Sequence, residues 1–244
     1  MINGLILAAG RGSRLKRFTK YRPKSFNKYN DKTFLDLIID NFKINKIKKI
    51  HIITGYKNNL FKNYKYRKFF NKEWNRSSIF FSLYQANELL KKSNCIISYS
   101  DIIYNKKAID ILKSAKGDIV VLNNLNWKSV WKLRFKNPLN DLETFKIEKF
   151  KKKNYLIEIG KKPKNLSQIK GQFCGLFKIT PKGWKKILQL ISILEIDYKN
   201  LDITSLLSLI IKKHKRLVTV EDYKDEWFEI DTLKDLKLLK KLYL

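Results

Sequence analysis

Short apolar runs alternate with segments of helical spacing along the first half of the chain. Runs that end near glycine or a polar turn predict buried strands. Apolar positions that recur every three or four residues predict helices between them. We expect strands at 3–8, 49–54, 95–99 and 118–122, and helices at 34–44, 79–90 and 106–114. This β-α-β-α order predicts a mostly parallel sheet with helices on both faces.

The pattern changes in the second half, where β-like runs lie close together and are joined by basic turns. We expect strands there at 144–148, 155–159, 172–179 and 217–220, and helices at 183–194, 202–213 and 233–242. The expected fold is therefore α/β: a Rossmann-like mixed, mostly parallel sheet flanked by helices, with a small antiparallel β insertion. Without an internal repeat or a Pro/Gly/Ser linker, residues 1–244 are expected to form one domain.

The charge of the chain is strongly positive, at +31, with 53 Lys and Arg against 22 Asp and Glu. Such an excess favours a polyanionic partner. The basic residues are spread along the chain, however, and Lys, Ile and Asn are abundant together, as in proteins from A+T-rich genomes. We therefore keep nucleic-acid binding only as an alternative, and expect the charge to help attract a small anion such as a nucleoside triphosphate.

Composition excludes several other classes. A chain with 44% hydrophobic and 13% aromatic residues is not a disordered protein. Two cysteines and two histidines exclude a disulfide scaffold and a cysteine- or histidine-rich metal site; Cys174 is expected to be a packed thiol. The apolar run at 203–211 is too short to cross a bilayer, and no signal segment precedes the first strand, so a cytoplasmic protein without membrane contact is expected.

The first candidate for chemistry is the turn after the first strand, LAAGRGSRL at 7–15. Gly10 and Gly12 allow backbone N–H groups to approach phosphate oxygens, and Arg14 can add a bidentate contact. Lys24, in a Pro-Lys pair, can return an ammonium group to the same phosphates. A dinucleotide fingerprint would need glycine where Leu15 stands, and no Gly-Lys-Ser/Thr of a Walker loop is present.

Taken together, LAAGRGSRL-x(7)-PK resembles the signature of the nucleotidyltransferases that make nucleoside-diphosphate sugars and CDP-alcohols. The resemblance implies the nucleotide-diphospho-sugar transferase fold, a triphosphate on the turn, and catalytic roles for Arg14 and Lys24. The nucleotide-binding residues that it implies are Leu7, Ala8, Ala9, Gly10, Arg11, Gly12, Ser13, Lys24, Gly55, Ser78, Gln85 and Ser100.

Two aspartates complete the resemblance. Asp101 lies in SYSDI and Asp231 in WFEID, each after an apolar run, where the family carries its magnesium-binding aspartates. Mg²⁺ prefers carboxylate and phosphate oxygens. Strand C-terminal ends meet at one edge of an open α/β sheet, so we expect both carboxylates to reach one cleft there. Glu229, two residues before Asp231, is expected to share that face as a further ligand or a supporting residue.

The segment at 77–86, the TGY at 54–56 and the EIDTLKDL at 229–236 are similar to the phosphocholine cytidylyltransferase-like branch. That branch implies CTP as the donor, a small phosphorylated or phosphonate acceptor such as phosphocholine or an aminoalkylphosphonate, and release of pyrophosphate. A sugar-1-phosphate nucleotidyltransferase is the alternative within the class. The sequence leaves open whether the chain forms a homo-oligomer.

The acceptor is expected to bind to the part of the chain at roughly 124–180. Trp127 and Trp131 share a face if their segment is helical, and they either stack on an ammonium group or pack in the core. Asp141, Glu143 and Trp227 can add to such a site, and Arg134 can hold the acceptor phosphate. The family resemblance adds Lys162 on the acceptor phosphate, and Gly175 is expected beside the acceptor.

Overall fold

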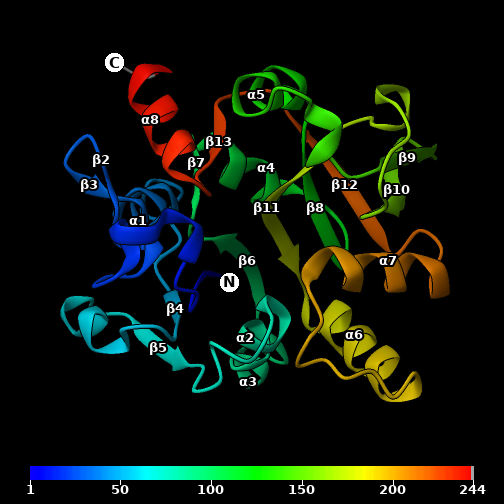
Figure 1. Cartoon of the computed structure of the whole chain (residues 1–244). Coiled ribbons are helices and arrows are strands. Elements are labelled where there is room, and N and C mark those ends of the chain that lie inside the picture. Colours follow the sequence, from blue (N-terminus) through cyan, green and yellow to red (C-terminus); the bar gives the residue numbers. More distant parts are fainter. Residues whose placement is uncertain (243–244) are drawn as a thin grey trace.

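The computed structural model describes residues 1–242. Nine strands form its main sheet: β1 (Ile2–Ala8), β4 (Ile50–Thr54), β5 (Arg67–Phe70), β6 (Asn94–Tyr99), β8 (Ile119–Asn124), β9 (Phe145–Phe150), β10 (Lys153–Ile159), β11 (Gln172–Ile179) and β12 (Val218–Tyr223). Their order across the sheet is β5-β4-β1-β6-β11-β8-β12-β10-β9 (Figure 1). Four further strands of two or three residues form two separate ladders: β2 (Lys28–Tyr29) with β3 (Lys32–Thr33), and β7 (Ile102–Tyr104) with β13 (Trp227–Glu229).

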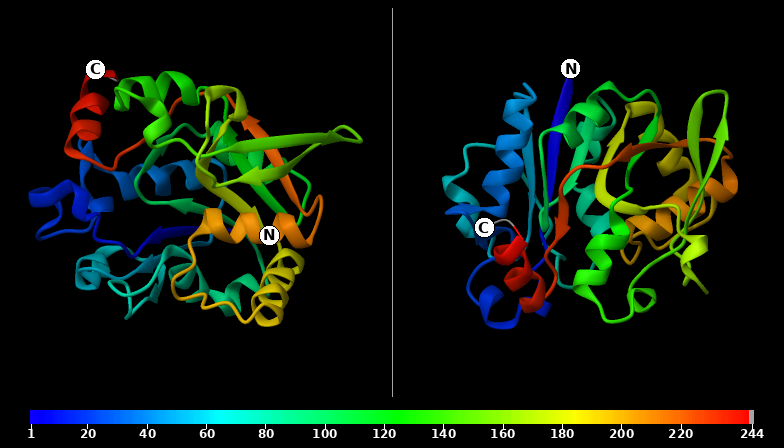
Figure 2. Two further views of the ribbon diagram at one scale, coloured as in Figure 1. Left: turned by 45° about the vertical axis from the view of Figure 1, so that its right-hand side comes forward. Right: turned by 90° about the horizontal axis from the view of Figure 1, so that it is seen from above.

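The sheet is mixed, as the sequence predicts. The pairs β5/β4, β4/β1, β1/β6 and β8/β12 are parallel, whereas β11 runs antiparallel between β6 and β8. The β9–β10 hairpin continues the same sheet through an antiparallel pairing with β12. In the left view of Figure 2 this hairpin projects from the body of the molecule. The expected antiparallel insertion is therefore an extension of the main sheet.

Eight α-helices are described: α1 (Phe34–Ile44), α2 (Ile79–Tyr84), α3 (Asn87–Leu90), α4 (Lys107–Ser114), α5 (Trp127–Arg134), α6 (Pro181–Ile193), α7 (Ile203–Lys213) and α8 (Leu233–Leu242). Alternate residues of β1 face different helices. Leu5 and Leu7 pack in a core with α2, α3, α6 and α7, and Ile6 and Ala8 pack in another with α1, α4 and α5. Within residues 1–242, no helix is both long and apolar enough to span a membrane.

The expected helix at 79–90 is in fact two helices, α2 and α3. Ala86 interrupts it, with φ −95° and ψ 18°, and its side chain is buried in the core. The edge strand β5 was not predicted, because its sequence, RKFF, carries two basic residues and no apolar alternation. A third core joins Leu15 and Phe34 to Phe228, Ile230 and two leucines of α8. It fixes the C-terminal segment beside the glycine turn.

Candidate active site

The glycine turn leaves β1 at the C-terminal edge of the sheet. Gly12 has φ 73°, and a Cβ placed on it would lie 2.7 Å from Cβ of Lys24. A side chain there is excluded both by the left-handed backbone and by this close approach. A Cβ on Gly10 would meet no atom within 4 Å. The turn is thus closed on the side of Lys24 and open at Gly10.

Lys24 lies at the start of a short 3₁₀ helix, Lys24–Phe26. Its Nζ donates to Oδ2 of Asp101 and to Oδ1 of Asp231, each at 2.7 Å, and its side chain is only 8% exposed. Burial by itself lowers the pKa of Lys24, but the two carboxylates outweigh it and hold that pKa above its usual value. Lys24 is therefore a charged ammonium group inside the site. Arg14 reaches the same Oδ1 of Asp231 at 2.8 Å from a more exposed position.

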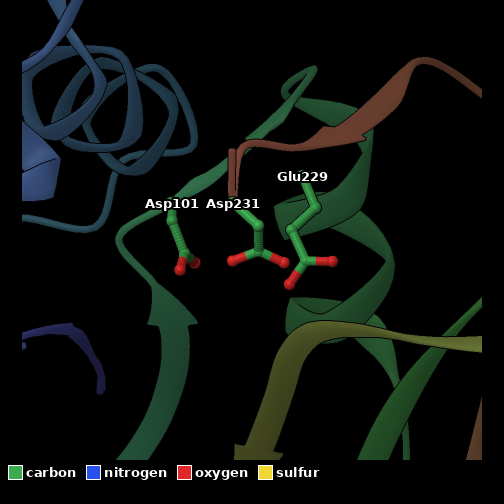
Figure 3. A group of neighbouring side chains, drawn as sticks. All are labelled: Asp101, Glu229 and Asp231. Atoms are coloured by element: carbon green, nitrogen blue, oxygen red, sulfur yellow. The ribbon is translucent and has the colours of Figure 1, made fainter. Parts of the chain in front are cut away.

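Three carboxylates, those of Asp101, Glu229 and Asp231, converge here with oxygen atoms within 4.8 Å of one another (Figure 3). Asp101 follows β6, as expected. Asp231 was also expected at the end of a strand of the main sheet, and this expectation is wrong. Asp231 follows β13, which pairs with β7 next to Asp101, and the N–H of Ile230 donates to the carbonyl of Asp101 at 2.9 Å.

The three carboxylates fit a hard divalent cation. Oδ1 of Asp101 is buried and has no hydrogen-bond partner among the described residues, so it is available as a ligand. Burial, followed by the charges of Asp231 and Asp101, raises the pKa of Glu229 to about 7. Burial also opposes ionisation of Asp231, but Lys24 above all, then Arg14 and Arg134, hold its pKa below the usual value. A cation would relieve the mutual repulsion of this acidic group.

Arg134 does not point at an acceptor, contrary to the sequence expectation. Its side chain is 1% exposed and donates to Glu229 at 3.0 Å, to Asp231 at 3.2 Å and to Asp235 at 3.0 Å. The physical reason is that clustered buried carboxylates require a buried cation. Asp235, to which the sequence analysis gave no role, also accepts from the N–H groups of Asp231 and Thr232 and so holds this segment in place.

Two cavities meet at these charges. The first, the turn cavity, lies between the glycine turn and α2; the second, the tryptophan cavity, lies beside Trp131 and Trp227. Arg14, Tyr99 and Asp231 line both of them. Molecules in the two cavities would therefore both lie beside Arg14 and Asp231.

Most of the predicted nucleotide-binding residues line the turn cavity: Leu7, Ala9, Gly10, Gly12, Ser13, Lys24, Ser78 and Ser100. Four do not. Ala8 faces the other side of the sheet, and the Arg11 guanidinium lies over the Tyr56 ring. Gly55 packs against the carbonyl of Ala9, and the Gln85 amide donates to the carbonyl of Phe81. The alternation of β1 and local packing account for these departures.

Of the predicted acceptor-binding residues, four line the tryptophan cavity: Trp131, Glu143, Gly175 and Trp227, together with Asp141. The rings of Trp131 and Trp227 are stacked, with centroids 5.7 Å apart and planes at 4°. Trp127 and Trp131 both lie on α5, as the helical spacing implies, but Trp127 packs in the core and lines neither cavity. Lys162 also lies outside both cavities, and its Nζ donates to the carbonyl of Asn140 at 2.6 Å.

Comparison with known proteins places this chain in a family. The MobA-like NTP transferase domain matches residues 4–143, more than half of the chain. The CTP:phosphoglutamine cytidylyltransferase of Campylobacter jejuni is 32% identical over 97% of this chain and 98% of its own length. Nucleotidyltransferases of this family generally use a divalent metal.

Solved structures share the fold. The CTP:phosphocholine cytidylyltransferase of Streptococcus pneumoniae superposes with a TM-score of 0.69 at 18% identity, over 100% of this chain and 99% of the other. The inositol-1-phosphate CTP transferase of T. maritima gives 0.75 at 16% identity, over 98% and 93%. With the glycine turn, Lys24 and the carboxylates in one site, the chain belongs to the MobA-like NTP transferase family and is a nucleotidyltransferase.

Proposed function

We propose that the protein transfers a cytidylyl group from CTP to a small phosphorylated or phosphonate acceptor and releases pyrophosphate. The observation that supports this most is the meeting of the two cavities at Arg14 and Asp231. CTP in the turn cavity and an acceptor in the tryptophan cavity would bring their phosphates to the same charged groups. The choice of CTP is supported by the full-length relative that uses it.

In the proposed reaction, an oxyanion of the acceptor attacks the α-phosphorus of CTP. A P–O bond forms there, and the bond from the α-phosphorus to the bridging oxygen breaks, so that pyrophosphate leaves with the electron pair. Backbone N–H groups at Gly10 and Gly12 would hold the triphosphate, while Lys24 and Arg14 would stabilise the developing charge. No nucleophilic side chain is required. Burial raises the pKa of Cys174, the one thiol lining the tryptophan cavity among the described residues, which keeps it inert.

We propose Mg²⁺ as the metal, with Asp101 and Asp231 as its ligands and Glu229 as a third carboxylate. When bound, the ion would neutralise charge on the phosphate oxygens and orient them. Arg134 and Asp235 would hold Asp231 in place, since both bind the segment that carries it.

The acceptor is proposed to carry an ammonium group. Asp141 and Glu143 line the tryptophan cavity, and neither forms an ion pair with any residue in 1–239; Asp141 accepts from Nε1 of Trp131 at 3.0 Å. In a chain of charge +31, two carboxylates in one cavity without a cationic partner among these residues favour a cationic ligand. The stacked Trp131 and Trp227 would add apolar contact. A sugar-1-phosphate would leave these carboxylates without a charged partner.

Pyrophosphate release tests the proposal. CTP and UTP should each be assayed with phosphocholine, phosphoethanolamine, 2-aminoethylphosphonate, phosphoglutamine and glucose-1-phosphate. We expect turnover with CTP and an aminated acceptor, and much lower turnover in the Asp101→Asn variant when the metal is limiting. Turnover confined to glucose-1-phosphate would overturn the acceptor class, and a clear preference for UTP would overturn the choice of donor.

A further inference from the structure

Asn71 follows β5 and is completely buried. Its side-chain Oδ1 accepts from the backbone N–H of Glu73 at 2.9 Å. Its Nδ2 donates to Oγ of Ser77 at 3.0 Å and to Oγ of Ser82 at 2.9 Å. One buried amide thus joins two hydroxyl groups that both line the turn cavity.

The direction of these hydrogen bonds is fixed by chemistry. A backbone N–H can only donate, so the amide atom that faces Glu73 must be the oxygen. The nitrogen of Asn71 therefore faces both serines, and both hydroxyl oxygens must accept from it.

The hydroxyl groups of Ser77 and Ser82 therefore differ in the hydrogen bonds that they can still form with a ligand. Ser77 donates its one hydrogen to the carbonyl of Glu73 at 2.7 Å, and a carbonyl can only accept. The hydroxyl group of Ser77 consequently has one unused lone pair and no hydrogen left to donate to a ligand. The hydrogen of Ser82 has no acceptor among the described residues, so Ser82 keeps a donor.

These hydroxyls lie in the part of the turn cavity that suits a nucleobase. The glycine turn and Lys24 supply the groups that bind phosphates, whereas the segment 74–82 supplies an indole, an aliphatic side chain and serine hydroxyls. Flat apolar and neutral polar groups of this kind bind aromatic ligands with a hydrogen-bonding edge.

We propose that Asn71 is a positioning residue that locks Ser77 as a hydrogen-bond acceptor, and that Ser77 thereby selects cytosine over uracil. The inference rests on the proposed function. The 4-amino group of cytosine donates to the lone pair of Ser77, and Ser82 donates to the adjacent ring nitrogen. Uracil presents a carbonyl oxygen at the 4-position, which would face the lone pair of Ser77 unpaired. Because Asn71 and Glu73 fix the hydroxyl, Ser77 cannot rotate to offer a hydrogen.

The test is the ratio of kcat/KM for CTP to that for UTP, measured at saturating acceptor and supplemented by calorimetric Kd values for both nucleotides. We expect Ser77→Ala to lower this ratio by about tenfold or more, the effect of losing one discriminating hydrogen bond. Asn71→Asp keeps the contact to Glu73 N–H but loses both donors, so it should lower the ratio too. The KM for the acceptor should not change. Ser192→Ala, at an exposed serine of α6, controls for the serine-to-alanine change.

An unchanged CTP-to-UTP ratio in folded Ser77→Ala would overturn the inference while leaving cytidylyl transfer intact. If Asn71→Asp does not fold, the Ser77→Ala ratio alone decides. If the unmodified protein shows no preference for CTP, the proposed donor is wrong, and the inference is overturned with it.

Discussion

Nζ of Lys24 lies 2.7 Å from Oδ1 of Asp231, although 207 residues separate them in the chain. The same nitrogen is bound equally closely by Asp101. One lysine thus joins the turn that follows the first strand to carboxylates from the middle and the end of the chain. Lys24 therefore contacts both proposed metal ligands at once.

Replacing Lys24 by alanine should lower kcat/KM by roughly 10²-fold or more, the size expected when a preorganised charge on a reacting phosphate is lost. Steady-state pyrophosphate release measures this, with circular dichroism to verify folding. Lys28→Ala, at an exposed lysine nearby, should keep near-normal kinetics. Near-normal turnover in a folded Lys24→Ala variant would mean that the Pro-Lys match is accidental.

Replacing Asp101 by asparagine should weaken metal binding, because it keeps the shape but removes one of three clustered charges. Titration calorimetry with Mg²⁺ or Mn²⁺ in the presence of nucleotide should show a Kd higher by about tenfold, a difference of about 1.4 kcal/mol. Asp110→Asn, at an exposed position of α4, is the matched control. Equal metal affinity in the Asp101→Asn and Asp110→Asn proteins would argue against the assigned ligands.

The two glycines of the turn should respond differently to alanine. Gly12→Ala forces a Cβ against Lys24 and a left-handed backbone, so the free energy of unfolding should fall by about 1–3 kcal/mol. Gly10→Ala meets open space and should change stability by less than about 0.5 kcal/mol. The methyl group added by Gly10→Ala would instead enter the turn cavity and raise the KM for the nucleotide. Urea unfolding measures the loss of stability, and steady-state kinetics measure the KM for the nucleotide. Equal stability and equal KM in the two variants would contradict the prediction.

Arg134→Met should destabilise the fold strongly. The guanidinium is buried against three carboxylates, and removing one partner of a buried ion pair costs about 3–5 kcal/mol. Arg216→Met breaks an exposed pair with Glu148 and should cost about 1 kcal/mol or less. The midpoint of chemical denaturation should be measured for both variants. Equal midpoints for the two variants would show that the buried network adds no stability.

Acidification should destabilise the protein in part through His51. Burial, then the charges of Arg67 and Lys49, lower the pKa of His51, whose Nε2 lies 3.1 Å from Oδ1 of Asn3. The unfolded state therefore binds the proton more readily, and this contribution to stability is present above about pH 6.5 and lost as the pH falls below it. Between pH 7.5 and 5.5, unfolding free energy should fall more in the unmodified protein than in His51→Gln. Equal falls would exclude His51 as a cause.

The sequence predicts the position of a site residue when that position follows from the residue's own strand. It does not predict the position when contacts with distant segments of the chain decide it. Asp101 was placed correctly because a carboxylate that follows a parallel strand lies at the sheet edge. Asp231 was expected from the same rule, but it arrives through the β13–β7 ladder, a long-range pairing that local periodicity does not encode. Arg134 was expected at a phosphate for its charge, and only the fold reveals that three carboxylates surround it. Asn71 carried no signal at all, because its partners are set by the loop after β5.

The β13–β7 ladder also affects the order in which activity is acquired during synthesis. A chain ending at Glu226 would contain all nine strands of the main sheet, yet it would lack Glu229, Asp231 and the segment that Arg134 holds. Such a truncated product would retain the residues of the glycine turn but lack two of the three clustered carboxylates. Since Glu229 and Asp231 are proposed metal ligands, we expect such a prematurely terminated chain to turn over no nucleotide.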